Sequence, residues 1–287
     1  MPRALLPASL LLLCSLLPAW VQADQGRLLA TGGATSIDGA AGGGIVPWAV
    51  LAGYGEQGEW GATAFVTRVE TGDYRLDVGG VAASYGNRIE LSYARQRFDL
   101  GTLARDLSLP NTLSQDILGL KVRLFGDLIY DQLPQVSLGI EHKRQKDFFV
   151  PNLIGAQRDE DTEAYLAASR LFLGGAFGYN LLVNGNLRYS RANEQGLLGF
   201  GGDRRDRHSV LKEGSLAVLL NPRWAVGVEY REKPDNLSFA GESDWSDVFV
   251  GYFPNKHLAV VLAYARLGEI AGLDNQDGAY LSIQGSF

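Results

Sequence analysis

The sequence feature that most constrains the fold is a period-two alternation of apolar and polar residues, repeated in segments of about ten residues. Within 177–190, Leu181 falls on one face of an extended chain and Asn184 on the other. The segments 222–232 and 278–287 repeat this pattern. Strands of this length with one apolar and one polar face are typical of β-barrels that cross the bacterial outer membrane.

The alternation predicts fourteen strands along the chain. Their ranges are 28–38, 45–54, 59–69, 72–85, 87–98, 116–126, 134–145, 162–172, 177–190, 210–220, 222–232, 245–253, 257–267 and 278–287. Long connections at 99–115, 146–161 and 191–209 alternate with tight turns, so the long loops gather at one end of the sheet. Outer-membrane barrels show this asymmetry and an even number of strands. We therefore predict an all-β, transmembrane, antiparallel up-and-down barrel of about fourteen strands. Twelve is the alternative if 28–38 and one other weak segment are not strands.

Aromatic residues lie near both ends of the predicted strands, among them Trp60 and Trp224 at the turn end and Tyr189 and Tyr230 at the loop end. Amphipathic aromatic side chains favour the two interfaces between membrane and water. The alternative is a soluble β-sandwich whose buried aromatic residues happen to lie at strand ends.

Residues 1–23 combine a basic residue, a leucine-rich run and small residues that end at Ala23. This pattern predicts a secretory signal peptide that is cleaved before Asp24, which leaves 24–287 as the barrel domain. A lipoprotein anchored through Cys14 is the rival interpretation. It is disfavoured because leucines precede this cysteine where small residues are needed.

The last predicted strand ends at Phe287, with Leu281 and Ile283 on the same face. This arrangement resembles the C-terminal signal that the barrel assembly machinery of Gram-negative outer membranes recognises. We expect that machinery and outer-membrane lipid as partners, and the bacterial outer membrane as the location. The sequence leaves the oligomeric state open.

The overall composition excludes several classes of protein. The chain has 26 Lys and Arg against 32 Asp and Glu, a net charge of −6, which argues against a nucleic-acid-binding protein. Beyond the predicted signal peptide, no apolar run reaches the ~20 residues that a transmembrane helix needs. Because Cys14 is the one cysteine, the mature chain has no thiol for disulfides or thiol catalysis.

Two stretches carry a resemblance to a known family. They are GGATSIDGAAGGGIVPWAVLAGYG at 32–55 and NRIELSYARQRFD at 87–99. Here the sequence resembles an uncharacterised bacterial family of predicted barrels, the domain of unknown function 3034. The resemblance implies the fold and the location, and it transfers no functional residue.

Motifs that would carry chemistry are few. The glycines at 39–44 lack the Lys and the following helix of a phosphate-binding loop, so we expect them to join two strands, to pack tightly or to fold inward. His142, His208 and His257 have no metal-ligand spacing. We therefore predict no catalytic residue, no metal and no cofactor. An outer-leaflet lipid hydrolase that uses His142 is a minor alternative.

Two charged loops are further candidate binding sites. The acidic run 159–163 has the residues of a divalent-cation site, and the basic run 201–208 has those of a site for anionic sugars or phosphates. Charge runs in long external loops are more often simply solvated.

Arginines recur at the loop ends of the predicted strands, on the lipid-facing side. They are Arg68, Arg97, Arg144, Arg191 and Arg266. Near the interface the cost of such charges is small, and lipopolysaccharide offers phosphates there. We expect these five residues to contact lipopolysaccharide.

The inward face is predicted to carry charges of both signs. The candidate lumen-lining residues are Arg75, Asp77, Arg88, Glu90, Lys121, Arg123, Glu141, Lys143, Arg188, Glu213, Arg223, Glu229 and Arg231. Such a lumen is either wet or filled by a salt-bridged network. Basic members outnumber acidic ones, which favours anions slightly.

The functional prediction is a passive, porin-like channel for small polar solutes that catalyses no reaction. The alternative is a structural or assembly barrel whose lumen is blocked by its own side chains or by an infolded loop such as 99–115 or 191–209.

Overall fold

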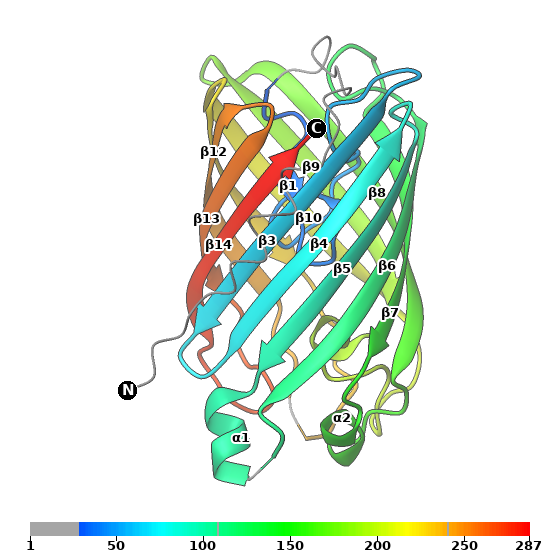
Figure 1. Cartoon of the computed structure of the whole chain (residues 1–287), viewed down its shortest axis with the longest axis vertical. Coiled ribbons are helices and arrows are strands. Elements are labelled where there is room, and N and C mark those ends of the chain that lie inside the picture. The colour runs from blue at the N-terminus through cyan, green and yellow to red at the C-terminus, as the bar shows by residue number, and fades with distance from the viewer. Residues whose placement is uncertain (1–28, 108, 240) are drawn as a thin grey trace, which may run out of the picture.

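The computed structural model describes residues 29–107, 109–239 and 241–287, so the predicted signal peptide lies outside the described residues. Twelve antiparallel strands form a closed barrel (Figure 1). They are β3 (Trp60–Thr71), β4 (Arg75–Tyr85), β5 (Ile89–Asp99), β6 (Thr112–Phe125), β7 (Gln135–Gln145), β8 (Glu160–Ala176), β9 (Tyr179–Ser190), β10 (Ser209–Asn221), β11 (Trp224–Arg231), β12 (Trp245–Asn255), β13 (Leu258–Arg266) and β14 (Asp277–Ser286). The predicted all-β, antiparallel up-and-down barrel is confirmed, with twelve strands.

Each strand pairs with its neighbour in sequence, and β14 closes the ring by pairing with β3. In that closing pair, Ile283 lies opposite Val66 and Leu281 opposite Arg68. Closure leaves the barrel without a free edge strand, because every wall strand is hydrogen-bonded to a neighbour on each side.

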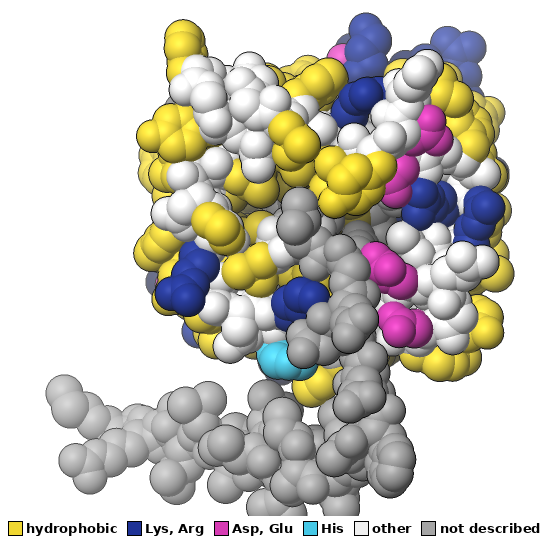
Figure 2. Space-filling view, turned by 90° about the horizontal axis from the view of Figure 1, so that it is seen from above, with side chains coloured by type: hydrophobic (Ala, Val, Ile, Leu, Met, Phe, Trp, Pro, Cys, Tyr) yellow, Lys and Arg dark blue, Asp and Glu magenta, His cyan; other side chains and the backbone are white. Residues whose placement is uncertain are grey.

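The outer surface of the barrel is apolar. In β5 and β6, Leu91 and Leu118 point outward and are 62% and 58% exposed, whereas Glu90 and Lys121 point inward and are buried. Figure 2, which looks onto the turn end, shows hydrophobic side chains around the perimeter. Large exposed apolar side chains over a whole barrel wall favour immersion in lipid.

The connections are unequal at the two ends, as predicted. The end drawn at the bottom of Figure 1 carries α1 (Gly101–Leu107), α2 (Phe149–Leu153) and the 3₁₀ helix η3 (Asn193–Gly196). We call this the loop end and the opposite one the turn end. The described residues contain no helix that is long and apolar enough to span a membrane.

The first two predicted strands, 28–38 and 45–54, are not part of the wall. Residues 29–55, which we call the plug, lie inside the ring of strands, where β1 (Ala34–Thr35) pairs with β2 (Ala41–Gly42) and Gly42 forms a single bridge to Pro47 (Figure 1). Residues 30–54 are buried without interruption, whereas a wall strand alternates between buried and exposed positions. The prediction failed because a glycine- and alanine-rich segment enclosed on every side has no polar face. The strand count is therefore twelve and not fourteen.

A second segment closes the loop end. The loop 191–208 turns inward, and Asn193, Leu197 and Phe200 within it are buried. The infolding of 191–209 that the sequence offered as an alternative is therefore confirmed. Glu194 and Gln195 both have positive φ angles, 42° and 60°, and this left-handed backbone makes the sharp turn.

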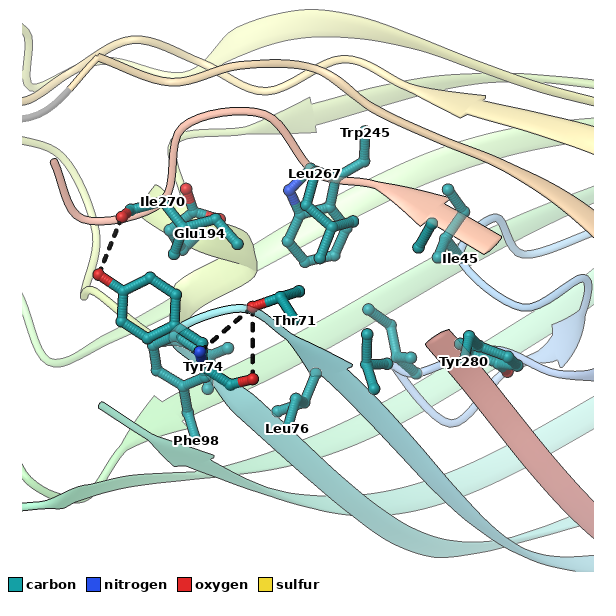
Figure 3. A pocket seen from close by; sticks show the side chains of 14 residues that line it. Ile45, Thr71, Tyr74, Leu76, Phe98, Glu194, Trp245, Leu267, Ile270 and Tyr280 are labelled. Atoms are coloured by element: carbon teal, nitrogen blue, oxygen red, sulfur yellow. Dashed lines mark hydrogen bonds between the residues drawn. The ribbon is translucent and has the colours of Figure 1, made fainter. Parts of the chain in front are cut away.

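Between this loop and the plug, the lumen is packed with apolar side chains. A cavity of about 30 Å³ remains there, lined by residues such as Ile45, Leu267 and Trp245 (Figure 3). Beside it, the Tyr74 hydroxyl donates a 3.0 Å hydrogen bond to the carbonyl oxygen of Ile270. A cavity of this size holds about one water molecule, so it is no ligand site.

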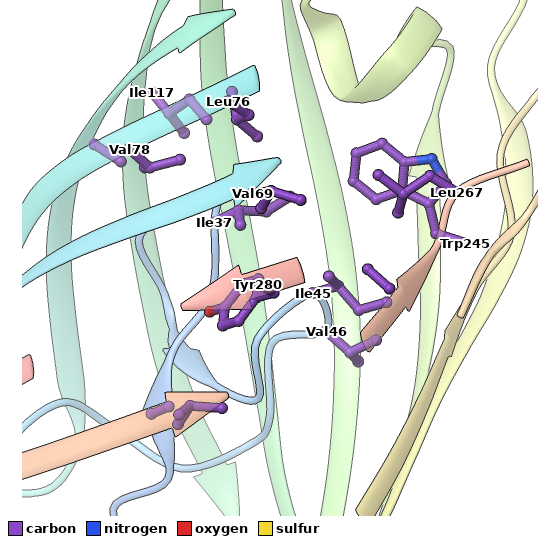
Figure 4. Close-up of a cluster of buried hydrophobic side chains, with 14 of the residues drawn as sticks. Ile37, Ile45, Val46, Val69, Leu76, Val78, Ile117, Trp245, Leu267 and Tyr280 are labelled. Atoms are coloured by element: carbon purple, nitrogen blue, oxygen red, sulfur yellow. The ribbon is translucent and has the colours of Figure 1, made fainter. Parts of the chain in front are cut away.

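The apolar packing joins wall, plug and loops into one cluster. Ile37 and Ile45 of the plug lie among Val69, Leu76 and Tyr280 of the wall (Figure 4). Burial of these side chains stabilises the seated plug through the hydrophobic effect, at roughly 1.5–3 kcal/mol for each large side chain.

Candidate functional site

The plug is held in the lumen by polar side chains of the wall. The Lys121 ammonium donates to the carbonyl oxygens of Ala41 and Val50, both at 2.8 Å. The Glu90 carboxylate accepts from the backbone N–H groups of Ala41 at 3.2 Å and Ala52 at 2.7 Å. Glu90 and Lys121 also form an ion pair at 3.2 Å. This one pair of wall residues therefore binds the plug at Ala41 and again at Val50 and Ala52.

A second set of contacts surrounds Ala49. Its backbone N–H donates to Ser169 Oγ at 2.8 Å. Its carbonyl oxygen accepts from Gln135 Nε2 and Ser137 Oγ, both at 2.6 Å. Wall side chains therefore satisfy both backbone polar groups of this buried residue, as a buried backbone requires.

Other wall side chains bind Pro47 and Trp48, the two plug residues that precede Ala49. The carbonyl oxygen of Pro47 accepts from Asn186 at 2.6 Å and from Asn184 at 3.3 Å. The Trp48 indole N–H donates to Ser215 Oγ at 2.9 Å. Asn184 and Asn186 of β9 are thus bonded to the plug backbone.

Glu229 marks a site where a buried carboxylate lies without a cation. It accepts from the backbone N–H of Ile45 at 2.9 Å and from Ser215 Oγ at 2.7 Å. Asp247 is its cross-strand partner on β12 and is also buried. Among the described residues, neither carboxylate has an ion-pair partner. Two such groups side by side are costly unless they are protonated or hydrated.

Asp38 lies at the centre of the strongest electrostatic contact between plug and wall. Its carboxylate is 2.6 Å from Arg231 Nη1, 3.0 Å from Lys143 Nζ and 3.8 Å from Arg188 Nη2. All four side chains are buried. Charge-assisted hydrogen bonds of this kind are short and strong.

The same three cations are already paired within the wall. Arg188 Nε lies 2.6 Å from Glu213 and Arg188 Nη1 lies 2.8 Å from Glu141, while Lys143 Nζ lies 2.9 Å from Glu163. The wall therefore balances three cations with three carboxylates before the plug adds Asp38. The seated plug gives this network one carboxylate more than it has cations.

Eight of the predicted lumen-lining residues do point inward and are buried. They are Glu90, Lys121, Glu141, Lys143, Arg188, Glu213, Glu229 and Arg231. Arg123 lies at the turn end, where its guanidinium is 3.1 Å from Asp127.

Four of the predicted lumen-lining residues lie elsewhere. Arg75 and Asp77 are on the outer face of β4, and Arg88 and Arg223 are exposed in tight turns. The prediction for β4 reversed its two faces because the inner face there meets the apolar cluster and carries Leu76. Without these four residues and Arg123, the predicted inner face keeps four cations and four carboxylates. The buried Glu163 and Asp247 raise the carboxylates to six, which reverses the predicted excess of basic residues.

Sequence reasoning missed several groups of the site. The alternation places Asp38 at the end of a predicted wall strand and does not assign Glu163 or Asp247 to the inner face, yet all three are buried. One signal was present, because Asp38 is the only charged residue in 28–55. A lone charge in a glycine-rich segment without alternation is better explained by a buried partner than by a wall strand.

The predicted arginine ring is only partly available to lipid. Arg68, Arg97, Arg144 and Arg266 are exposed on the outer face near the loop end. Arg191 is instead 14% exposed and lies 2.5 Å from Asp161. Its ion pairs within the loop explain why that part of the prediction was wrong.

The three histidines lie apart. His142 is on the outer face with its Nδ1 3.0 Å from Thr162 Oγ1, whereas His208 is 3.0 Å from Asp161 and His257 is 3.1 Å from the carbonyl oxygen of Ser286. Within the described part of the chain, no group of three or more His, Cys, Asp or Glu side chains is placed to hold a metal ion.

The family model described as a protein of unknown function, DUF3034, matches residues 31–284. The chain belongs to this family. The matched range includes most of the plug as well as the barrel, so the family is defined over both parts. None of the curated proteins matches the chain in sequence.

Solved outer-membrane barrels have a similar fold. The KdgM porin aligns with a TM-score of 0.50 at 10% identity, over 78% of this chain and 99% of that chain. The NanC porin has a TM-score of 0.46 at 11% identity, with 79% and 98% covered. An outer membrane channel from Pseudomonas putida F1 has a TM-score of 0.45 at 11% identity, with 82% and 96% covered. At these identities the likeness concerns the fold, which is that of an outer-membrane β-barrel.

Proposed function

We propose that this protein is an outer-membrane channel for small polar solutes that its own plug holds closed. The observation that carries the proposal is the polarity of the wall where it contacts the plug. Charged and amide side chains of the wall bind the plug backbone there. If the plug leaves, groups such as Lys121, Glu90 and Asn186 face an empty lumen and become hydrated. A wide lumen lined by hydrated polar groups conducts small solutes by diffusion.

The path of the plug supports a reversible closure. Leu29 lies beside Asn180 and Asn221, which belong to the turn end, and Gly55 lies beside Trp60 at the start of β3. Both ends of the plug therefore leave the barrel through the same opening. A looped segment of this kind can be withdrawn without threading its end through the barrel.

The charges of the wall determine whether the open channel favours cationic or anionic solutes. The inward-facing cations are Lys121, Lys143, Arg188 and Arg231, and the inward-facing carboxylates are Glu90, Glu141, Glu163, Glu213, Glu229 and Asp247. Because carboxylates exceed cations, we infer a preference for cationic over anionic solutes.

The decisive experiment locks the plug in its seat and measures conductance. Ala49→Cys combined with Ser169→Cys introduces thiols on two neighbouring residues, since the backbone N–H of Ala49 lies 2.8 Å from Ser169 Oγ. In planar bilayers, we expect discrete openings when the pair is reduced and their loss when it is oxidised. Each single-cysteine variant should show the same openings under both conditions.

The second candidate is a permanently closed structural barrel. The inward-folded loop 191–208 favours it, because this segment closes the loop end of the lumen independently of the plug. Silence of the reduced double-cysteine variant, with no openings at any voltage, would favour this candidate over the channel.

Location and partners belong to the same proposal. We place the barrel in the bacterial outer membrane, with its loop end outward and the plug ends on the periplasmic side. Its final strand β14, which ends beside Phe287, would serve as the signal for the assembly machinery. Arg68, Arg97, Arg144 and Arg266 would contact lipopolysaccharide. The proposal assigns no reaction to the barrel.

A further inference from the structure

The wall recognises the main chain of the plug at regular intervals. At Ala41, Ile45 and Ala49, spaced four residues apart, wall side chains bind both the N–H and the carbonyl oxygen of the same residue. The donor and acceptor pairs are Lys121 with Glu90 at Ala41, Arg231 with Glu229 at Ile45, and Gln135 and Ser137 with Ser169 at Ala49. A wall that supplies at least one donor and one acceptor to the backbone of each of three residues has the chemistry of a peptide-binding site.

Further contacts extend this recognition along the plug. Gln96 donates to the carbonyl oxygen of Ile37 at 2.9 Å, and Ser84 donates to that of Ala52 at 2.6 Å. Thr63 accepts from the backbone N–H of Gly53 at 3.1 Å. These bonds depend on the position of a peptide group and on no particular side chain.

Close approach at Gly43 adds a requirement for a small residue. A Cβ atom on Gly43 would lie 1.8 Å from Glu229 Oε1 and within 2.7 Å of the whole carboxylate. Glu229 is buried and already binds Ile45 and Ser215, so it has no other place to go without losing those bonds. At Gly32, by contrast, a Cβ atom would meet its nearest neighbours at 3.6 Å, an ordinary contact.

We propose that the lumen wall is a binding site for a looped, glycine- and alanine-rich polypeptide segment and that it binds such a segment in trans as well as its own plug. The inference rests on the proposed function in one respect, because the resident plug must be able to leave. It also names the class of ligand that the lumen binds, which is polypeptide. The uncharged peptide backbone fits the spacing of the donors and acceptors on the wall. Asp38 adds a single anchoring charge to this recognition.

The test uses the full chain and separates the plug only after folding. A protease site placed at the exposed residues 56–58 allows the connection between plug and β3 to be cut in the folded barrel. A fluorescent synthetic peptide of residues 29–57 is then added, and its binding is followed by polarisation. We expect saturable exchange with the cut plug and competition by the unlabelled peptide.

Two variant peptides make the test specific. The peptide with Gly43→Val should bind at least about tenfold more weakly, whereas the peptide with Gly32→Ala should bind within about twofold of the original. A scrambled peptide of the same composition is the control for adventitious binding. Equal binding of the scrambled or the Gly43→Val peptide would overturn the proposal.

The failure of this inference can be told apart from the failure of the channel. If the cut plug never exchanges although the reduced double-cysteine variant shows openings, binding in trans is wrong and the channel stands. If the cut plug never exchanges and no openings occur, both are wrong. Exchange of the peptide without any conductance would retain the peptide site and reject the channel.

Discussion

The Arg231 guanidinium donates a 2.6 Å hydrogen bond to Asp38, and this contact joins the plug to a group of three wall cations that three wall carboxylates already balance. Arg231 also lies 3.1 Å from Glu213 and donates to the carbonyl oxygen of Ile45 at 2.8 Å. It therefore bridges plug and wall, whereas Asp38 belongs to the plug alone. Loss of the two residues should accordingly have unequal effects.

Asp38→Asn should cost less than Arg231→Met. Asparagine removes one carboxylate from a network that has one too many, so the loss is limited to weakened hydrogen bonds, about 1.5–3 kcal/mol. Arg231→Met leaves four buried carboxylates with two cations, and breaking a buried pair in this way costs about 3–5 kcal/mol. The measurement is the free energy of unfolding in urea, in detergent. Arg97→Met, at an exposed arginine, is the control, and an equal loss for Asp38→Asn and Arg231→Met would contradict the charge balance.

Lys121 and Glu90 should behave as one coupled unit. Lys121→Met leaves the Glu90 carboxylate buried without its cation, which should loosen the plug. Glu90→Gln in the same chain removes that unpaired charge and should restore part of the loss, with a coupling energy of about 0.5–3 kcal/mol. The readout is the rate at which a cysteine at Ala49, a buried position, reacts with a maleimide. Additive effects of the two substitutions would mean that the pair does not hold the plug.

Period-two alternation could predict the wall because each wall residue faces either lipid or lumen. The strands predicted at 177–190 and 278–287 correspond to β9 (Tyr179–Ser190) and β14 (Asp277–Ser286) within two residues. The plug could not be predicted in this way, since burial on all sides removes the polar face that the pattern needs. Both predicted plug strands, 28–38 and 45–54, are absent from the wall. The number of wall strands therefore stays even, and the rule that such barrels have an even number of strands could not reveal the error.

Prediction of the site was limited by what fills the lumen. The expectation of a polar interior holds where Glu90 and Lys121 meet the plug backbone, and also near the loop end, where Lys143 and Arg188 are buried. It fails on β4, where Leu76 and Val78 face an apolar cluster and Asp77 points outward. Which side of the lumen is dry depends on the inward-folded loop and the plug, and neither is visible in the pattern of a single strand.

Closure of the loop end should weaken as the pH rises from about 5 to 8. Glu194 is buried, 2.7 Å from Lys233, and its backbone N–H donates to Glu242. Burial raises the pKa of Glu194 from 4.5 to about 8, with Glu242 acting in the same direction and Lys233 opposing both. The folded state therefore holds a proton that the unfolded chain releases near pH 4.5. Its stabilisation is complete below that pH and is lost as the pH rises through the folded pKa, at about 1 kcal/mol per pH unit within the window.

The measurement for this effect is the unfolding temperature in detergent between pH 5 and 9. The wild type should lose stability across the window more steeply than Glu194→Gln, which stays neutral at every pH. Identical pH profiles for the two proteins would show that Glu194 is not the titrating group.

An outward-facing position in the middle of the wall should not tolerate a charge. Leu118 on β6 is 58% exposed, and Leu118→Arg should cost about 2–4 kcal/mol of folding free energy in lipid vesicles if it lies near the bilayer midplane. Leu133, in the turn between β6 and β7, is similarly exposed at 55%. Leu133→Arg should have little effect because that turn lies outside the hydrocarbon. Equal costs at both positions would contradict the placement of the barrel in lipid.

The exposed arginines of the loop end should stabilise the barrel more in membranes that contain lipopolysaccharide than in membranes of phospholipid alone. Arg97, Arg144 and Arg266 lie on the outer face at the ends of three strands, where phosphates of lipopolysaccharide would meet them. Combined charge reversal to Glu should lower stability by about 1–3 kcal/mol more in membranes that contain lipopolysaccharide than in phospholipid alone, since each exposed pair contributes up to about 1 kcal/mol. Arg223→Glu, at the turn end, should show no such difference because lipopolysaccharide occupies only the outer leaflet. Equal effects of the triple variant in both membranes would remove these arginines as lipopolysaccharide contacts and leave the barrel fold untouched.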